Sequence, residues 1–330
     1  MSVSYHNIVI SRTDSLGDVV LTLPLCGLIK QYYPNCNIHF IGQHYTKELI
    51  SQCAYVDFFW DKAEILQQPI LWQQIQADVI VFALPDKSIA RAAAKAKIPM
   101  RIGTSHRWWH WLYANKRPSF SRKHSDLHEA QLNCKLLAPL GIEQTPTLEQ
   151  LTAWIGLKPP EGLDDIIDRP VGWLCLVMHP KSKGSAKEWP LECYFALAQQ
   201  LQGVPVQICI TGVAAEGAHI RQRCPELFAL PNVKDLTGQL SLQELMRLLA
   251  DADLMLACST GPLHIAAALG TAVIGLYPQE RPTHPGRWQP LGLEVDILSI
   301  AAQNHSTLAG IQVAEVLERV LRRLSLEKTA

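Results

Sequence analysis

Short runs of β-branched and apolar residues alternate with longer helix-like segments along the 330 residues of this chain. Such alternation is typical of parallel sheets whose strands are joined by crossover helices. The predicted strands lie at 7–11, 37–41, 55–59, 78–83, 100–103, 173–178, 206–211, 233–236, 254–258 and 272–276. The predicted helices lie at 18–33, 87–97, 191–201, 242–250, 262–269 and 313–324.

A chain of this length is too long for one ordinary core and suits two α/β domains of similar size. Between the two halves, the segment LKPPEGLDDIIDRP (157–170) is rich in proline and acids and is interpreted as a linker. The expected domains are therefore 1–165 and 166–330. Each is predicted to be a Rossmann-like, doubly wound parallel sheet, and ligands would bind in a cleft between the carboxyl ends of the two sets of strands.

The net charge does not indicate a binding partner, because 30 basic residues balance 30 acidic ones. The nine cysteines are scattered, several in apolar runs, and form no CxxC pair, which favours buried thiols in a reducing compartment. The N-terminus shows no signal-peptide pattern, and no apolar run approaches the ~20 residues of a membrane span. A cytoplasmic protein is expected.

The first predicted strand runs into Ser15-Leu16-Gly17-Asp18. Gly17 permits a tight turn, and the simpler interpretation of Asp18 is that it caps the following helix. A carboxylate at this edge of a sheet would also be placed to accept a proton from an attacking hydroxyl. Asp14 is the rival carboxylate, and local chemistry does not choose between them. The absence of GxGxxG and GxxxxGK[ST] disfavours dinucleotide-fold dehydrogenases and P-loop NTPases.

In the second half, MHPKSKGSAKEWP (178–190) follows a strong strand and carries Lys181, Lys183 and Lys187 before a helix start. Backbone N–H groups at a helix start together with lysines suit a diphosphate, although a solvated basic loop is the simpler interpretation.

A second anion-binding device is predicted at Ser259-Thr260-Gly261-Pro262, where another strand meets a helix. His264, one turn into that helix, is by itself more typical of a packed core histidine than of a catalyst. Two anion sites in one cleft fit a nucleotide diphosphate better than a single phosphate.

From Lys87 to Lys123 the chain has ten lysines and arginines and no acid, and Trp108, Trp109 and Trp111 are interleaved with them. A solvated helix face is the simpler interpretation. Tryptophans beside cations also suit a membrane interface or an anionic glycan. No nucleic-acid partner is expected, since no binding module is recognisable and the net charge is zero. No metal site is expected either, because the histidine pairs lack an HExxH pattern or clustered carboxylates.

Taken together and in order, SLGDVVLTLP, AKEWP, STGPLHIAAALG and GLYPQERPTHPGRWQPLG resemble the ADP-heptose:lipopolysaccharide heptosyltransferase family, over residues 8–292. The resemblance implies the two-domain GT-B fold and an inverting, metal-independent transfer of heptose without a cofactor. It further implies ADP-heptose as the donor and the anionic lipid A/Kdo core of lipopolysaccharide as the acceptor. The enzyme would be cytoplasmic, with peripheral contact to the inner membrane surface, and its last helix would pack back on the first domain.

The resemblance also implies roles for individual residues. Asp18, rather than Asp14, is the expected base, with the backbone of Ser15 and Gly17 beside it. Lys187 would neutralise the donor diphosphate. The remaining donor-binding residues implied by the family are Ser182, Lys183, Ser185, Glu216 at the ribose, Leu240 near the adenine, Ser259, Thr260, Gly261 and His264. The basic residues expected at the acceptor are Arg91, Arg101, Arg107 and Arg122.

One position departs from the family pattern. Where the family has an aspartate that contacts the donor sugar, this chain has Ser259, which cannot make the charged hydrogen bonds of a carboxylate. Two alternatives therefore stay open: a glycosyltransferase with another nucleotide-sugar donor, and a catalytically degenerate GT-B binding protein.

Overall fold

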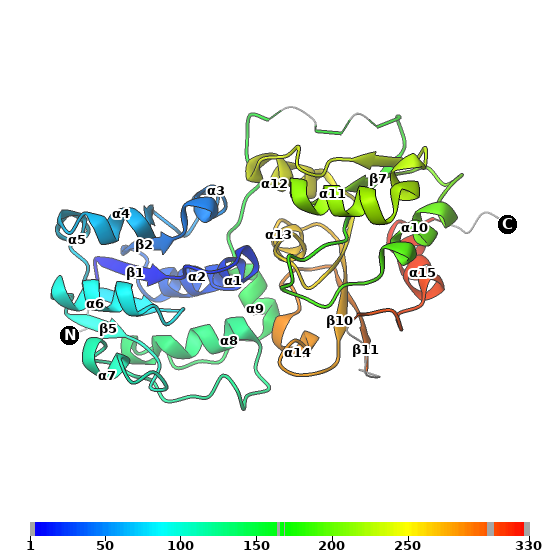
Figure 1. The fold of residues 1–330 in the computed structure, drawn as a ribbon. Coiled ribbons are helices and arrows are strands. Elements are labelled where there is room, and N and C mark those ends of the chain that lie inside the picture. Colours follow the sequence, from blue (N-terminus) through cyan, green and yellow to red (C-terminus); the bar gives the residue numbers. More distant parts are fainter. Residues whose placement is uncertain (1–3, 164–165, 168, 302–306, 327–330) are drawn as a thin grey trace. The chain divides into compact units, whose positions relative to one another are not determined.

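The computed structural model describes residues 4–163, 166–167, 169–301 and 307–326, and the chain divides into two compact units, 1–158 and 159–330 (Figure 1). The division falls inside the proline-rich segment 157–170, a few residues before the expected boundary at 165/166.

The first unit is built on a parallel sheet of five strands in the order β3-β2-β1-β4-β5. The strands are β1 (Asn7–Ser11), β2 (Asn37–Gly42), β3 (Phe58–Asp61), β4 (Val79–Phe82) and β5 (Met100–Ile102). β3 starts later than predicted because its pairing with β2 begins only at Phe58, opposite His39. The direction of strand addition reverses between β1 and β4, so the loop after β1 opens at the topological switch point, where such sheets bind ligands.

Short helices join these strands: α1 (Leu16–Val20), α2 (Leu23–Tyr32), α3 (Lys47–Ser51), α4 (Lys62–Gln67), α5 (Ile70–Ile75), α6 (Lys87–Lys95), α7 (His110–Tyr113), α8 (Glu129–Cys134) and α9 (Leu148–Ala153), with 3-10 turns η1 (His44–Thr46) and η2 (Lys135–Leu140). The single helix predicted at 18–33 is wrong, since it is divided into α1 and α2. Pro24 has no N–H and would clash with the carbonyl of Val20, so a continuous helix is interrupted there.

The second unit contains a parallel sheet of six strands in the order β11-β10-β9-β6-β7-β8. Its strands are β6 (Leu174–His179), β7 (Val206–Ile210), β8 (Val233–Asp235), β9 (Leu254–Cys258), β10 (Val273–Pro278) and β11 (Val295–Ile300). The first five match the prediction, whereas the edge strand β11 was not predicted. The switch point lies between β6 and β9, so the loops that follow these two strands share one edge of the sheet.

The helices of this unit are α10 (Leu191–Gln200), α11 (Ala214–Arg223), α12 (Leu242–Asp251), α13 (Gly261–Ala268), α14 (Pro285–Trp288) and α15 (Val313–Arg323), with the 3-10 turn η3 (Pro225–Ala229). The apolar face of the last helix packs within its own unit. Val316 and Val320 of α15 are fully buried in the core of the second unit, and Figure 1 shows α15 beside α10. Arg319 also pairs with Asp296 of β11 at 2.7 Å.

The cysteines behave as the sequence predicts. All nine are free thiols, and all but Cys193 are buried. Burial raises the pKa of Cys53 to about 11 and that of Cys134 to about 12, so these side chains act as small apolar groups. In the described part of the chain, no helix has the length and apolarity that crossing a lipid bilayer would require.

Candidate active site

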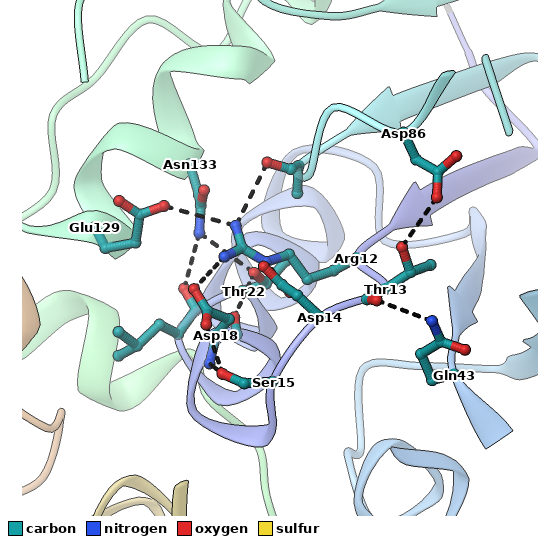
Figure 2. Close-up of polar contacts among 12 residues, drawn as sticks. Arg12, Thr13, Asp14, Ser15, Asp18, Thr22, Gln43, Asp86, Glu129 and Asn133 are labelled. Atoms are coloured by element: carbon teal, nitrogen blue, oxygen red, sulfur yellow. Dashed lines mark hydrogen bonds and ion pairs between the residues drawn. The ribbon is translucent and has the colours of Figure 1, made fainter. Parts of the chain in front are cut away.

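The loop after β1 fixes Asp18 at the start of α1. Ser15 is the N-cap residue of this helix, and its hydroxyl accepts a hydrogen bond from the backbone N–H of Asp18 at 3.5 Å. The same hydroxyl donates to Oδ2 of Asp18 at 2.5 Å. Thr22 then donates its hydroxyl to the backbone carbonyl of Asp18 at 2.8 Å. Asp18 therefore does lie in the first helical turn, as its capping interpretation requires, but its side chain points back into the loop (Figure 2).

Arg12, which no sequence motif indicates as a site residue, lies at the centre of this loop. Its side chain is almost fully buried and donates from Nη2 to Oδ1 of Asp18 and from Nε to Oδ1 of Asp14, the latter at 2.7 Å (Figure 2). Nη1 lies 3.6 Å from Oε1 of Glu129. Burial alone would lower the pKa of Arg12, but Asp18, Asp14 and Glu129 outweigh it and raise that pKa. The guanidinium is thus a fixed positive charge that orients both loop carboxylates.

Asp14 and Asp18 differ in their surroundings although they share Arg12. Burial raises the pKa of Asp14, and the charge of Asp18 adds to the rise against the attraction of Arg12. Asp14 is also fixed through its main chain, since Tyr45 donates its hydroxyl to the Asp14 carbonyl at 2.6 Å. Asp18 has the better hydrogen-bonded carboxylate, because one oxygen faces Arg12 and the other faces Ser15.

Arg122, a predicted acceptor residue, joins this same network. Its guanidinium contacts Glu129 and donates to Oδ1 of Asn133 at 2.9 Å. Asn133 in turn donates to the carbonyl of Leu21, the C-cap residue of α1, at 3.2 Å. Arg122 therefore connects the segment before α8 to this helix, and Glu129 of the same helix contacts Arg12 of the first loop.

The other predicted acceptor residues are distributed differently. Arg91 and Arg107 are exposed, whereas Arg101 donates from Nε to the Tyr113 carbonyl at 2.7 Å and also contacts the Ile98 carbonyl. Arg101 thus ties β5 to the segment around α7.

The tryptophans of this segment separate into core and surface. Trp109 packs against the core of the first unit, while Trp108, Trp111 and Leu112 are 68%, 63% and 64% exposed. Lys87 lies 5.1 Å from the ring centroid of Trp108, and Arg117 lies 4.4 Å from that of Trp111. We call Trp108, Trp111 and Leu112 the aromatic surface.

In the second unit, Glu188 organises the predicted phosphate loop after β6. Ser182 donates from its backbone N–H and from its hydroxyl to Oε1 of Glu188, 2.8 Å in both cases, and Lys181 pairs with Oε2. Ser185 donates its hydroxyl to the carbonyl of Ser182 at 2.7 Å. Burial would raise the pKa of Glu188, but the bonds from Lys181 and Ser182 outweigh it and lower that pKa. The hydroxyl of Ser182, predicted to contact phosphate, is buried and used within the loop.

Beside this loop lies a cavity of about 700 Å³. It is lined by Lys181, Lys183, Gly184, Ala186, Glu188, Val213, Ala215, Glu216, His219 and Thr307. Lys183 and Gly184, at the turn of this loop, have positive φ angles of 50° and 80°. Glu216 is held in the first turn of α11, where its Oε2 accepts from the N–H of Val213 at 2.8 Å.

The cavity brings together two predicted donor residues, Lys183 from the loop after β6 and Glu216 from the helix after the neighbouring strand β7. Leu240 does not line it; this residue lies half-buried in the loop before α12. Lys187 does not line it either, and instead lies 3.4 Å from Oε2 of Glu280, which follows β10.

At the carboxyl end of β9, Thr260 is the N-cap residue of α13, whose first residue is Gly261. Thr260 is 4% exposed, and its Oγ1 has no hydrogen-bond partner among the described residues. His264 is buried in the same helix. Ser259 is half-buried directly after β9. On the neighbouring strand β10, Tyr277 donates its hydroxyl to the Trp288 carbonyl at 2.8 Å.

Among the described residues, histidine, cysteine and carboxylate side chains do not gather in groups of three or more that would hold a metal ion.

The chain is similar to known glycosyltransferases. Over 306 residues (87% of this chain and 86% of the relative) the chain is 27% identical to a Haemophilus influenzae protein named "Putative glycosyltransferase". It is 24% identical over 304 residues (89% and 85%) to a lipopolysaccharide core heptosyltransferase of the same organism. The structure of Escherichia coli ADP-heptose lipopolysaccharide heptosyltransferase II superposes with a TM-score of 0.77 at 20% identity, covering 97% of this chain and 98% of that one.

The structural likeness confirms the predicted GT-B fold with its two parallel-sheet α/β units. Residues 71–314 match glycosyltransferase family 9 (heptosyltransferase), which covers most of the chain. The protein is therefore a glycosyltransferase, and the resemblance first seen in the four motifs is confirmed. The chain belongs to glycosyltransferase family 9, the heptosyltransferase family.

Proposed function

We propose that this enzyme transfers a heptose from ADP-heptose to a hydroxyl of the lipopolysaccharide inner core, with inversion at the anomeric carbon. The observation that carries the proposal is the 700 Å³ cavity in which Lys183 and Glu216 meet. A cavity of this size suits a nucleotide, because the lysine supplies charge for a phosphate and the carboxylate accepts hydrogen bonds from ribose hydroxyls.

In the proposed reaction, the acceptor oxygen attacks the anomeric carbon of the heptose as the bond to the donor diphosphate breaks. Asp18 takes the proton of the attacking hydroxyl, and ADP leaves with the electron pair of the broken bond. The carboxylate is well suited to this role because Arg12 and Ser15 hold both of its oxygens in a fixed orientation.

Charge that develops on the leaving diphosphate has to be stabilised. We assign this task to Lys187 and Lys183, with the N-terminus of α13 at Gly261 adding its backbone N–H groups. With lysines in this role, the reaction needs neither a metal nor a cofactor, and transfer should persist in the presence of EDTA. A transfer rate that falls to background in EDTA and returns with Mg²⁺ would contradict the proposal that the reaction needs no metal.

The acceptor we propose is the phosphorylated, Kdo-bearing lipid A core, and the aromatic surface is its place of contact with the membrane. Trp108, Trp111 and Leu112 are exposed and have Lys87 and Arg117 against the tryptophan rings. Exposed tryptophans beside cations are suited to the headgroup region of an anionic bilayer. Arg91 and Arg107, also exposed, extend the positive charge of this segment. The enzyme would work at the cytoplasmic face of the inner membrane.

The direct test is transfer from ADP-heptose to a Kdo-bearing lipid A acceptor by the purified chain, preceded by a thermal-shift comparison of ADP, UDP and GDP. Ligand binding to the folded state raises the melting temperature, so ADP should raise it most. A larger shift with UDP or GDP would identify another donor. Lys187→Ala should weaken ADP binding, and Lys234→Ala, in the edge strand β8 and half-buried like Lys187, serves as its control. Absence of binding by every nucleotide would favour a degenerate binding protein.

A further inference from the structure

The loop after β6 has different neighbours on its two sides. On the side of β7, Lys183 and Glu188 line the 700 Å³ cavity together with Glu216 of α11. In the other direction along the sheet, Lys187 lies close to Glu280, which follows β10. The strand order is β10-β9-β6-β7. A ligand that extends from the cavity past the loop after β6 would therefore lie next to Lys187 and then next to the ends of β9 and β10.

Glu280 has one used and one unused carboxylate oxygen. Oε2 lies 3.4 Å from Nζ of Lys187, whereas Oε1 is buried and has no hydrogen-bond partner among the described residues. A buried carboxylate oxygen without a donor is unfavourable, so its presence calls for an explanation. A ligand hydroxyl or N–H that donates to Oε1 would provide one.

A second unused oxygen lies at the same edge of the sheet. Thr260 Oγ1 is buried and without a partner among the described residues. Its strand β9 pairs with β10 up to Cys258 opposite Leu276, so Thr260 and Glu280 both follow the carboxyl ends of adjacent strands. A carboxylate only accepts hydrogen bonds, while a threonine hydroxyl donates and accepts. A phosphate would be repelled by the carboxylate, and a neutral group with several hydroxyls would satisfy both oxygens.

We propose that Glu280 is a specificity-determining residue of the donor-sugar subsite. Its Oε1 accepts a hydrogen bond from a hydroxyl of the sugar being transferred, and its Oε2 holds Lys187 beside the diphosphate. The nucleoside lies on the β7 side of the loop and the sugar on the β9/β10 side. This assignment rests on the proposed function, since it takes the donor to be a nucleotide diphosphate sugar bound by the second unit.

Isothermal titration of the full chain with ADP and with ADP-heptose separates the sugar from the nucleotide. Glu280→Gln keeps the shape of the side chain and removes its charge. We expect its affinity for ADP to stay within about threefold of wild type and its affinity for ADP-heptose to fall about tenfold, because the neutral amide oxygen of glutamine accepts a weaker hydrogen bond than a carboxylate oxygen. Glu280→Asp, which keeps the charge on a shorter side chain, should bind ADP-heptose with intermediate affinity. The exposed Glu192→Gln is the matched control and should change neither affinity.

Equal losses of ADP and ADP-heptose affinity in Glu280→Gln would show that Glu280 acts only through Lys187, and would overturn the sugar contact. Unchanged affinity for both ligands would overturn it as well. Melting temperatures of all variants show whether they are folded. If the wild-type chain binds ADP and ADP-heptose with equal affinity, the proposed sugar subsite is wrong but the nucleotide site is supported. If it binds neither ligand, the proposed donor itself is wrong.

Discussion

Arg12 donates from Nη2 to Oδ1 of Asp18, within the loop that follows the central strand of the first unit. The guanidinium is buried, so carboxylates take the place of water as its hydrogen-bond and charge partners. Asp14 and Glu129 also fix its orientation. A base that is oriented before the substrates arrive does not have to be ordered during the reaction. The relationship therefore connects the packing of this loop directly to the proposed chemistry.

The two loop carboxylates should differ in their effect on transfer. Asp18→Asn should lower kcat by about 10³-fold, because the amide cannot accept the proton of the attacking hydroxyl. Asp14→Asn should retain activity within about tenfold, since its amide oxygen can still accept from Arg12. Steady-state kinetics on the two variants, with folding checked by circular dichroism, makes the comparison. If Asp14→Asn is the variant that loses activity, the base has been assigned to the wrong carboxylate.

Arg12→Lys should act on turnover more than on donor binding. A lysine keeps the charge but has no planar fork, so it cannot hold Asp14 and Asp18 together. We expect kcat to fall by about 10–100-fold, with the KM for the donor within about threefold, because the donor residues lie in the second unit. Arg247→Lys, at a surface pair with Asp251, is the matched control. A raised donor KM with unchanged kcat would speak against a positioning role for Arg12.

The aromatic surface should determine binding to lipid. Replacement of Trp108 and Trp111 by alanine should reduce binding to vesicles that contain about one third anionic lipid by about tenfold or more, because two exposed rings would no longer enter the headgroup region. Cosedimentation measures the binding to vesicles. The difference between anionic and neutral vesicles gives the part of this binding that depends on charge. Replacement of Tyr32 and Ile70, exposed apolar side chains elsewhere on this unit, is the control. Transfer to a water-soluble acceptor should stay unchanged; equal vesicle binding by both double variants would refute the membrane assignment.

His39 should make the stability of the protein depend on pH. This histidine of β2 is buried against Phe58 and accepts a hydrogen bond from Trp60 at 3.0 Å. Burial lowers its pKa to about 4. Below pH 6.5 the unfolded chain takes up a proton that the folded protein refuses, so the stabilisation is complete above pH 6.5 and is lost as the pH falls toward 4.

Between pH 7 and pH 4.5 this group alone would lower the free energy of unfolding by about 2–3 kcal/mol. Urea unfolding at several pH values should show a shallower loss of stability in His39→Gln than in wild type. The exposed His124→Gln variant should keep the wild-type slope. Parallel pH profiles for His39→Gln and wild type would show that His39 is not the group responsible.

Much of the fold follows from local patterns. Buried parallel strands such as β1, β6 and β9 are continuous apolar runs, because helices cover both faces of the sheet, and such runs are legible in the sequence. The edge strand β11 escaped prediction since only two of its six residues are buried. The break between α1 and α2 depends on Pro24, which the apolar periodicity around it conceals.

The loops that carry the candidate site were also predictable, because a parallel sheet brings the carboxyl ends of its strands to one edge and the motifs follow those ends. The partners of the side chains were not. Arg12 appears in the sequence as an ordinary loop arginine, and only the approach of Glu129 from α8 and of the Ala83 carbonyl after β4 buries it beside Asp18. Lys187 meets Glu280 only because β10 lies two strands from β6. The sequence by itself determined the family, the two parallel sheets and the loops that hold the site; the tertiary structure decided which charges face each other, since those contacts join residues far apart in the chain.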